Sequence, residues 1–169
     1  MTDLATFLPA LRRVQLLVLD VDGVLTDGRL YYGARGESLK VFNVKDGHGI
    51  KQVAAAGITV AIISGRRSPI VARRARELGI RHVSQGVGDK FAALTKLAKS
   101  RNVALEHCAC VGDDTPDVPM LHAAGLAIAV ADAHADARAV ADLVTTRAGG
   151  QGAVREVCDW LVDARRLRA

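Results

Sequence analysis

The 169-residue sequence has few aromatic residues, few cysteines and no long apolar run, and each shortage excludes a class of protein. Aromatic residues make up 4% of the chain and accompany no basic stripe, so we expect no nucleic-acid partner. The cysteines are odd in number and include a C-x-C pair, which argues against a disulfide framework or a zinc knuckle (Cys108, Cys110, Cys158). No run is long enough to span a membrane, so we expect no membrane partner. The start of the chain lacks a basic leader followed by an apolar core, and we therefore expect a cytoplasmic protein.

Half of the residues are hydrophobic, and most of these are Ala, Val, Leu and Ile, which suit helices packed on a parallel sheet. Apolar runs alternate with helical patterns along the chain. Strands are expected at 15–19, 58–63, 81–84, 108–111, 126–130 and 143–144, and helices at 3–13, 50–56, 69–78, 89–100, 116–124, 135–139 and 153–167. This alternation predicts a doubly wound, Rossmann-like α/β fold with a mainly parallel sheet and helices on both faces. We expect residues 1–169 to form a single domain.

Residues 29–43 interrupt this alternation with two β-rich stretches on either side of a turn marked by Gly33 and Gly36. The pattern predicts a β-hairpin that projects from the sheet. A hairpin of this length cannot bury a core of its own, so we expect no separate cap domain. Its apolar residues need a covering, which other subunits could supply. The alternative is a hairpin folded back on its own subunit.

Two carboxylates, Asp20 and Asp22, follow the first apolar strand directly and precede Gly23. In α/β proteins, ligands bind outside the carboxyl ends of the strands. Two charges this close repel each other, so the pair calls for a cation or a proton between them. The plainer alternative is an ordinary polar transition from strand to loop, in which Asp and Gly are common.

Three further groups follow other strands, and parallel strands place their carboxyl ends at one edge of the sheet. They are Ser64-Gly65-Arg66, then Lys90 at a helix start, then Asp113-Asp114 with Asp117 three residues on. Each group also has a plain interpretation, because Asp114 could cap a helix and Lys90 could be a solvated surface residue. Their convergence on Asp20 and Asp22 favours a functional site.

The chemistry of these groups is consistent with phosphate monoester hydrolysis. Converging carboxylates form a hard-oxygen site suited to Mg²⁺, while Ser64 and Lys90 can bind phosphoryl oxygens. A carboxylate can act as a nucleophile and form an aspartyl-phosphate. A second carboxylate two residues on can protonate the leaving oxygen and then activate water. The net charge of +5 also favours an anionic small-molecule partner.

The segments DVDGVLTDG (20–28), ISGR (63–66), Lys90 and GDDTPD (112–117) resemble, in order, the four motifs of the haloacid dehalogenase superfamily. The segments FNVKDGHGI (42–50), AVADAH (129–134) and RAGGQGAVREVCD (147–159) more closely resemble its 3-deoxy-D-manno-octulosonate 8-phosphate (KDO 8-phosphate) phosphatase branch. The resemblance implies a Mg²⁺-dependent hydrolase of a sugar phosphate in the KDO pathway of lipopolysaccharide biosynthesis. It also implies a homotetramer whose hairpins form a central barrel and whose neighbouring subunits help to close each site.

The resemblance further implies a role for each matching residue. Asp20 would be the nucleophile and Asp22 the general acid/base, while Ser64 and Lys90 would bind phosphate. Asp20, the backbone carbonyl of Asp22, and Asp113 would hold Mg²⁺. Asp114 would support the metal ligands, and Asp117 would steady Lys90.

Residues on the sugar side are harder to assign from the sequence. Arg66 has a planar fork that suits the carboxylate of an acid sugar, and Gly65 offers a backbone N–H beside it. Asp46 and Gly47 stand at an expected helix start near the same edge, although Asp46 could simply cap that helix. Arg155 follows the glycine-rich segment 149–152, which could lie over a neighbour's site or only form the loop before the last helix.

Three other interpretations remain open at this point. The substrate could be a nine-carbon acid sugar phosphate such as KDN 9-phosphate, because the catalytic residues would be the same. A receiver-like signalling domain also combines acids, a hydroxyl and a lysine, but it lacks a partner acid two residues after the acceptor. A non-catalytic partner module would be expected to have lost its acids, whereas every acid is present here.

Overall fold

The computed structural model describes residues 4–166, and its centre is a sheet of six parallel strands in the order β5-β4-β1-β6-β7-β8. These strands are β1 (Leu16–Leu19), β4 (Thr59–Ser64), β5 (His82–Gln85), β6 (Cys108–Gly112), β7 (Leu126–Ala129) and β8 (Leu143–Val144). The chain winds outward from β1 in both directions, first through β4 and β5 and then through β6 to β8. This confirms the predicted doubly wound α/β fold. The switch point, where such folds bind ligands, lies beside β1.

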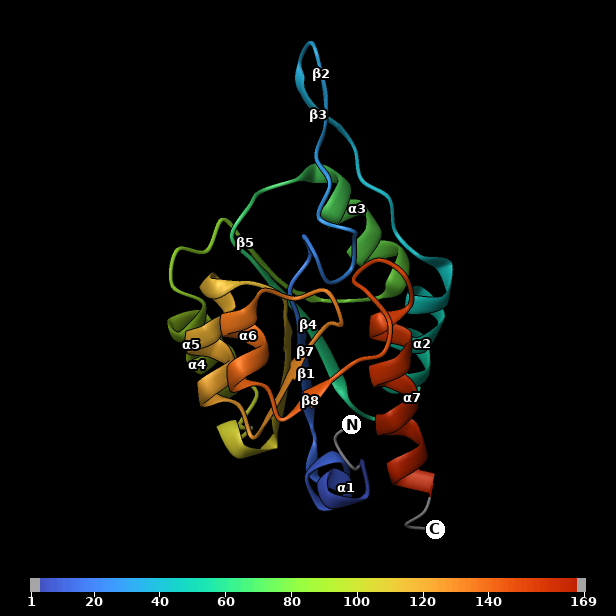
Figure 1. Cartoon of the computed structure of the whole chain (residues 1–169), viewed down its shortest axis with the longest axis vertical. Helices are drawn as coiled ribbons and strands as arrows, with labels where there is room; N and C mark the ends of the chain where they lie inside the picture. Colours follow the sequence, from blue (N-terminus) through green and yellow to red (C-terminus); the bar gives the residue numbers. More distant parts are fainter. Residues whose placement is uncertain (1–3, 167–169) are drawn as a thin grey trace.

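Helices cover both faces of the sheet (Figure 1). One face carries α2 (Val44–Ala55), α3 (Pro69–Leu78) and α7 (Ala153–Arg166), with α1 (Leu4–Arg13) packed against α7, and the other carries α4 (Lys90–Ser100), α5 (Val118–Ala123) and α6 (Ala135–Val140). Positions 3 and 167 of the expected terminal helices lie outside the described residues. Within residues 4–166, no helix is long and apolar enough to cross a membrane.

Strand β1 is buried on both faces, which explains its uninterrupted apolar sequence. Leu17 and Leu19 belong to the core cluster beneath α2, α3 and α7, whereas Leu16 and Val18 belong to the cluster beneath α4, α5 and α6. All four side chains are fully buried. Because successive residues of a strand point to opposite faces, a strand between two helical layers needs apolar residues throughout.

Helix α2 begins at Val44, six residues before the expected start at Ile50. Asn43 caps it, with its side chain accepting a hydrogen bond from the N–H of Lys45 at 2.9 Å. The first turns contain Gly47 and Gly49, which would ordinarily weaken a helix. A Cβ at Gly47 would lie 2.4 Å from the Arg74 guanidinium, and one at Gly49 would lie 2.9 Å from side-chain atoms of α7. Close packing against α3 and α7 therefore explains why this helix contains glycine.

A hairpin of β2 (Tyr31–Gly33) and β3 (Gly36–Leu39) projects beyond the carboxyl end of the sheet, at the top of Figure 1. Four of its flanking and strand residues expose large apolar side chains: Leu30, Tyr32, Leu39 and Val41. The described chain has no separate cap domain, in agreement with the expectation from the hairpin's length.

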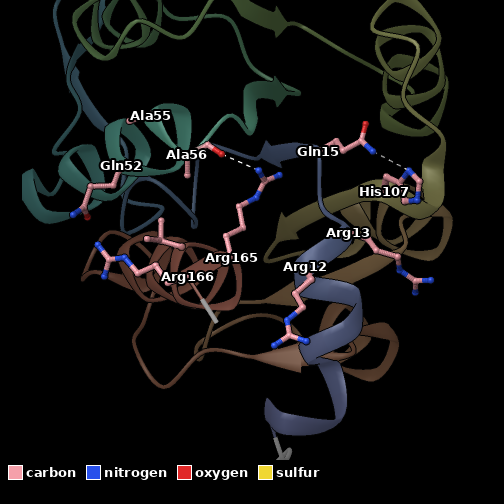
Figure 2. Close-up of a pocket in the computed structure, with 10 residues that line it drawn as sticks. Arg12, Arg13, Gln15, Gln52, Ala55, Ala56, His107, Arg165 and Arg166 are labelled. Carbon is pink, nitrogen blue, oxygen red and sulfur yellow. Dashed lines mark hydrogen bonds between the residues drawn. The ribbon is translucent and has the colours of Figure 1, made fainter. Parts of the chain in front are cut away.

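At the opposite end of the sheet, α1, α2 and α7 border a cavity of about 810 Å³ that is rich in arginine (Figure 2). Arg165 donates to the carbonyl of Ala56 and to that of Val14, both at 2.8 Å. It thereby ties α7 to the end of α2 and to the segment that enters β1. This cavity lies at the amino ends of the strands, away from the carboxylates identified in the sequence.

Candidate active site

Three carboxylates meet at the carboxyl end of the sheet. Asp20 follows β1, Asp113 follows β6, and Asp117 ends the 3-10 turn Thr115–Asp117 before α5. One oxygen from each lies within 4.8 Å of the others. The N–H of Asp20 extends the sheet by donating to the carbonyl of Val111 at 3.1 Å, which fixes the end of β1 against β6. The parallel pairing of two strands therefore brings together acids that are more than ninety positions apart.

Lys90 is the cation of this cluster. Its ammonium donates to Asp20 Oδ1 at 2.8 Å and to Asp117 Oδ1 at 2.5 Å, and the residue is 6% exposed. The other oxygen of Asp117 accepts from the backbone N–H groups of Asp113 and Asp114, at 3.0 and 3.2 Å. Asp117 is thus fully engaged and holds Lys90 against Asp20.

Burial and mutual repulsion raise the pKa values of the two remaining acids. Burial raises the pKa of Asp20 to about 6; the charge of Lys90 opposes this rise and that of Asp117 adds to it. Burial, followed by the charges of Asp20 and Asp117, raises the pKa of Asp113 to about 8. Burial alone would lower the pKa of Lys90, but the carboxylates of Asp20 and Asp117 outweigh it and raise that pKa. One ammonium therefore does not offset the negative charge that three ionised carboxylates would place here.

The arrangement fits a hard divalent cation. Asp20 and Asp113 offer carboxylate oxygens, and Mg²⁺ prefers one or two carboxylates together with carbonyl, water and phosphate oxygens. Gly23 leaves the room that Asp113 needs, because a Cβ there would lie 2.0 Å from Asp113 Oδ2, and its φ of +95° also favours glycine. The short D-x-D-G sequence therefore supplies acids and the space beside them.

Asp22 lies beside this cluster and faces the hairpin. One oxygen, Oδ1, accepts a hydrogen bond from the ammonium of Lys40, and the other, Oδ2, lies 3.7 Å from Nε of Arg66. Lys40 also lies 3.0 Å from Glu37 Oε1. Neither Lys40 nor Glu37 was predicted from the sequence. The available signal was weak: two opposite charges three residues apart in a hairpin that is otherwise rich in apolar and small residues.

Ser64 and Arg66 lie at the end of β4, the neighbour of β1. Ser64 is buried, and its carbonyl accepts from the N–H of Val87 at 3.1 Å, which holds the strand end to the loop before α4. The Arg66 side chain is 40% exposed and reaches both Asp22 and Glu37. This edge of the site thus presents a hydroxyl group and a guanidinium.

Asp114 and the glycine-rich loop take up local structural contacts. Asp114 is exposed, and its side chain accepts from the N–H of Thr115 at 2.7 Å, as a capping residue does. The N–H of Gly150 donates to the carbonyl of Val24 at 2.9 Å, and a Cβ at Gly149 would lie 1.7 Å from the carbonyl oxygen of Gly23. The loop therefore packs tightly on the turn that follows Asp22 in the same chain.

Asp46, Gly47 and Arg155 are placed between α2 and its neighbouring helices. Asp46 is 1% exposed, and its Oδ1 accepts from the N–H of Arg155 at 2.7 Å, at the start of α7. The side chain of Arg155 pairs with Asp159 at 2.7 Å. A carboxylate is favourable at a helix N-terminus, so Asp46 caps α7 from the neighbouring helix. The structure gives these three residues contacts within the α2, α3 and α7 layer and not with the carboxylate cluster.

The doubly wound sheet and the acids at its switch point define a haloacid dehalogenase-like hydrolase, and residues 80–157 match the family of that description. The 3-deoxy-D-manno-octulosonate 8-phosphate phosphatase KdsC of Escherichia coli K12 is 50% identical over 152 residues, which cover 90% of this chain and 81% of that protein. Its counterpart from Yersinia pestis is 47% identical over the same coverage. The chain belongs to the 3-deoxy-D-manno-octulosonate 8-phosphate phosphatase family.

Solved structures show the same relationship. The Moraxella catarrhalis phosphatase of this name, crystallised with magnesium, phosphate and KDO, has a TM-score of 0.94 and 43% identity, covering 97% of this chain and 94% of that one. The cobalt-bound Haemophilus influenzae enzyme has a TM-score of 0.91 and 43% identity, with 93% and 92% coverage.

Proposed function

We propose that this protein hydrolyses KDO 8-phosphate to KDO and phosphate, as a step of KDO formation for lipopolysaccharide. The observation that carries the proposal is the cluster of Asp20, Asp113 and Lys90 at the switch point of the sheet, in a chain half identical to phosphatases of that name. The carboxylates, the buried ammonium and the space beside Gly23 together suit a phosphoryl group and a divalent cation.

Mg²⁺ is the cofactor that the oxygen-only donors favour. Asp20, Asp113 and the backbone carbonyl of Asp22 would hold it, and when bound it supplies positive charge that offsets the negative charge of the phosphoryl group. In this proposal Asp114 supports these ligands through the turn that it caps. Asp117 has a different task, because both of its oxygens already accept hydrogen bonds.

Asp20 carries out the first chemical step. Its carboxylate oxygen forms a bond to phosphorus as the bond from phosphorus to the sugar oxygen breaks, which gives an aspartyl-phosphate. Lys90 and Ser64 hold the non-bridging oxygens, and the charge of Lys90 also favours the ionised form of Asp20 against the effect of burial. Asp22 donates its proton to the departing sugar oxygen.

Asp22 also serves the second step, in the opposite sense. It accepts a proton from water as the water oxygen attacks phosphorus, and the bond between phosphorus and Asp20 breaks. Phosphate leaves, Asp20 is again a carboxylate, and Asp22 is again protonated. The two acids thus divide the work as nucleophile and proton carrier.

We also propose that Arg66, with the N–H of Gly65, contacts the acid-sugar part of the substrate. The 40% exposure of the Arg66 side chain and its place beside Asp22 support this role. For Asp46, Gly47 and Arg155, the contacts between α2 and α7 support a structural contribution.

The same family assignment supports three coarser proposals. Residues 1–169 form one domain with a hairpin insert; of these, 1–3 and 167–169 lie outside the described part. The exposed apolar hairpin residues support a homotetramer in which a neighbouring subunit helps to complete each site. The three cysteines are unpaired and buried, which supports a reducing, cytoplasmic location.

The test is phosphate release with Mg²⁺ from KDO 8-phosphate, KDN 9-phosphate and p-nitrophenyl phosphate, with Asp20→Asn as the inactive control. We expect the highest kcat/KM for KDO 8-phosphate and no turnover by the control. A higher kcat/KM for KDN 9-phosphate would reassign the substrate. If neither KDO 8-phosphate nor KDN 9-phosphate is turned over, the proposal is refuted. Equal turnover of all three substrates would leave a phosphatase without the proposed substrate specificity.

A further inference from the structure

Lys40 is a buried lysine at the base of the hairpin, where the chain returns from β3 to the body of the protein. Its side chain is 1% exposed, and its ammonium bonds to Asp22 Oδ1 and lies 3.0 Å from Glu37 Oε1. Lysine is seldom buried unless it is paired, because removing an ammonium from water is costly. Two carboxylates therefore hold this ammonium at a defined point beside the site.

The two oxygens of Asp22 have different neighbours. Oδ1 faces the buried ammonium of Lys40, whereas Oδ2 faces Arg66 at 3.7 Å, a side chain that is 40% exposed. Arg66 is also engaged by the hairpin, since it lies 3.3 Å from Glu37 Oε1 and donates to the Tyr32 hydroxyl at 3.1 Å. Lys40 is therefore enclosed by its carboxylate partners, whereas Arg66 is partly open to solvent.

We propose that Lys40, held by Glu37, is a positioning residue that fixes the Asp22 carboxylate for proton transfer to the leaving oxygen. The inference rests on the proposed function, in which Asp22 is the proton carrier. Asp22 lies in the turn after β1, and its side chain has rotational freedom that a backbone position alone does not remove. An ammonium bonded to Oδ1 leaves Oδ2 as the oxygen on the side of Arg66, whose side chain is partly open to solvent.

Proton transfer depends strongly on such placement, because the donor must come within hydrogen-bond distance of the departing oxygen. Side chains at reacting centres are held by a supporting set of hydrogen bonds. The hairpin thus contributes to chemistry through its base, while its tip extends away from the sheet (Figure 1).

A comparison of leaving groups separates positioning from a purely structural role. The alkoxide that departs from KDO 8-phosphate needs a proton, whereas p-nitrophenolate is stable as an anion and needs little help. The ratio kcat/KM reports the steps up to the first irreversible one, here the transfer of the phosphoryl group to Asp20. We expect Lys40→Met to lower kcat/KM roughly a hundredfold for KDO 8-phosphate, the scale of general acid catalysis. For p-nitrophenyl phosphate we expect kcat/KM of Lys40→Met to stay within about threefold of the wild-type value.

Lys40→Arg should recover part of the loss on KDO 8-phosphate, because it retains a cation that can bond to Asp22. Lys51→Met, at an exposed lysine of α2, is the matched control and should match the wild type on both substrates. Glu37→Gln keeps Lys40 but removes one of its two carboxylate partners, so it should show the same selective loss at smaller size. If Lys40→Met does not fold, the comparison of the two substrates is made with Glu37→Gln instead.

An equal loss on both substrates, or no loss on either, would overturn the role of Lys40. Failure of the proposed substrate is a separate outcome. If the wild type does not turn over KDO 8-phosphate, β-glycerophosphate replaces it as the alkyl substrate, and the same ratio against p-nitrophenyl phosphate decides the inference.

Discussion

Binding of Mg²⁺ should displace about one proton at pH 7, and Asp113 should be its main source. The pKa of Asp113 is about 8, so at pH 7 this carboxyl is about nine-tenths protonated before the cation arrives. Asp20, with a pKa of about 6, contributes about a further tenth. A carboxyl must lose its proton to coordinate a cation, so binding releases these protons to the buffer.

The same two values predict how the affinity for Mg²⁺ changes with pH. Between pH 8 and pH 6, protonation of Asp113 and Asp20 should weaken the apparent binding about a hundredfold, which is about 2.7 kcal/mol. Binding of a cation to carboxylates that titrated near their ordinary values, about 4, would be almost independent of pH in this range.

Isothermal titration calorimetry at pH 7 in two buffers of different ionisation enthalpy measures the released protons directly. We expect about one proton per bound Mg²⁺ for the wild type and a much smaller release for Asp113→Asn, with weaker binding. Asp136→Asn, which removes an exposed acid of α6, should behave as the wild type does. Release of no proton at pH 7, or an affinity that is constant from pH 6 to 8, would refute the reasoning.

Three other changes test separate parts of the molecule. Arg165→Met should lower the free energy of unfolding by about 2 kcal/mol in urea titrations, because two hydrogen bonds from a charged donor are lost; Arg73→Met, at a 78% exposed side chain, should cost little. Gly149→Ala should lower kcat/KM roughly tenfold or more, because the added Cβ must displace the turn at Gly23. Gly88→Ala is the control, because a Cβ there meets open space and should leave kcat/KM unchanged. Without divalent cations, the melting temperature should fall as pH rises from 6 to 8. In this range Asp113 still holds a proton in the folded protein, whereas in the unfolded chain it has already lost it. Asp113→Asn should make the melting temperature depend less on pH.

The sequence was sufficient to predict the sheet because its signals are local. Each inner strand is a short apolar run between two helical patterns, and α3 begins and ends at the expected residues, Pro69 and Leu78. The acids that follow β1 and β6 could be assigned to one edge because all parallel strands end on the same side.

The features that the sequence did not predict depend on contacts between distant segments. The early start of α2 was missed because Gly47 and Gly49 are typical of a turn until α3 and α7 are seen packed against them. Lys40 and Glu37 were missed because hairpin charges ordinarily face solvent, and only the folded hairpin base turns them toward Asp22. Asp46 precedes Gly47 and was a candidate for the site, but its carboxylate accepts a hydrogen bond from the backbone N–H of Arg155 in the first turn of α7.

The placement of the two terminal helices has a practical consequence. The start of α1 and the end of α7 lie at one pole of the molecule, and the hairpin lies at the other (Figure 1). A fusion partner or surface tether joined before α1 or after α7 would therefore stand far from the catalytic edge. If the subunits assemble through their hairpins, attachments beside these two helices would be displayed on the outside of the particle.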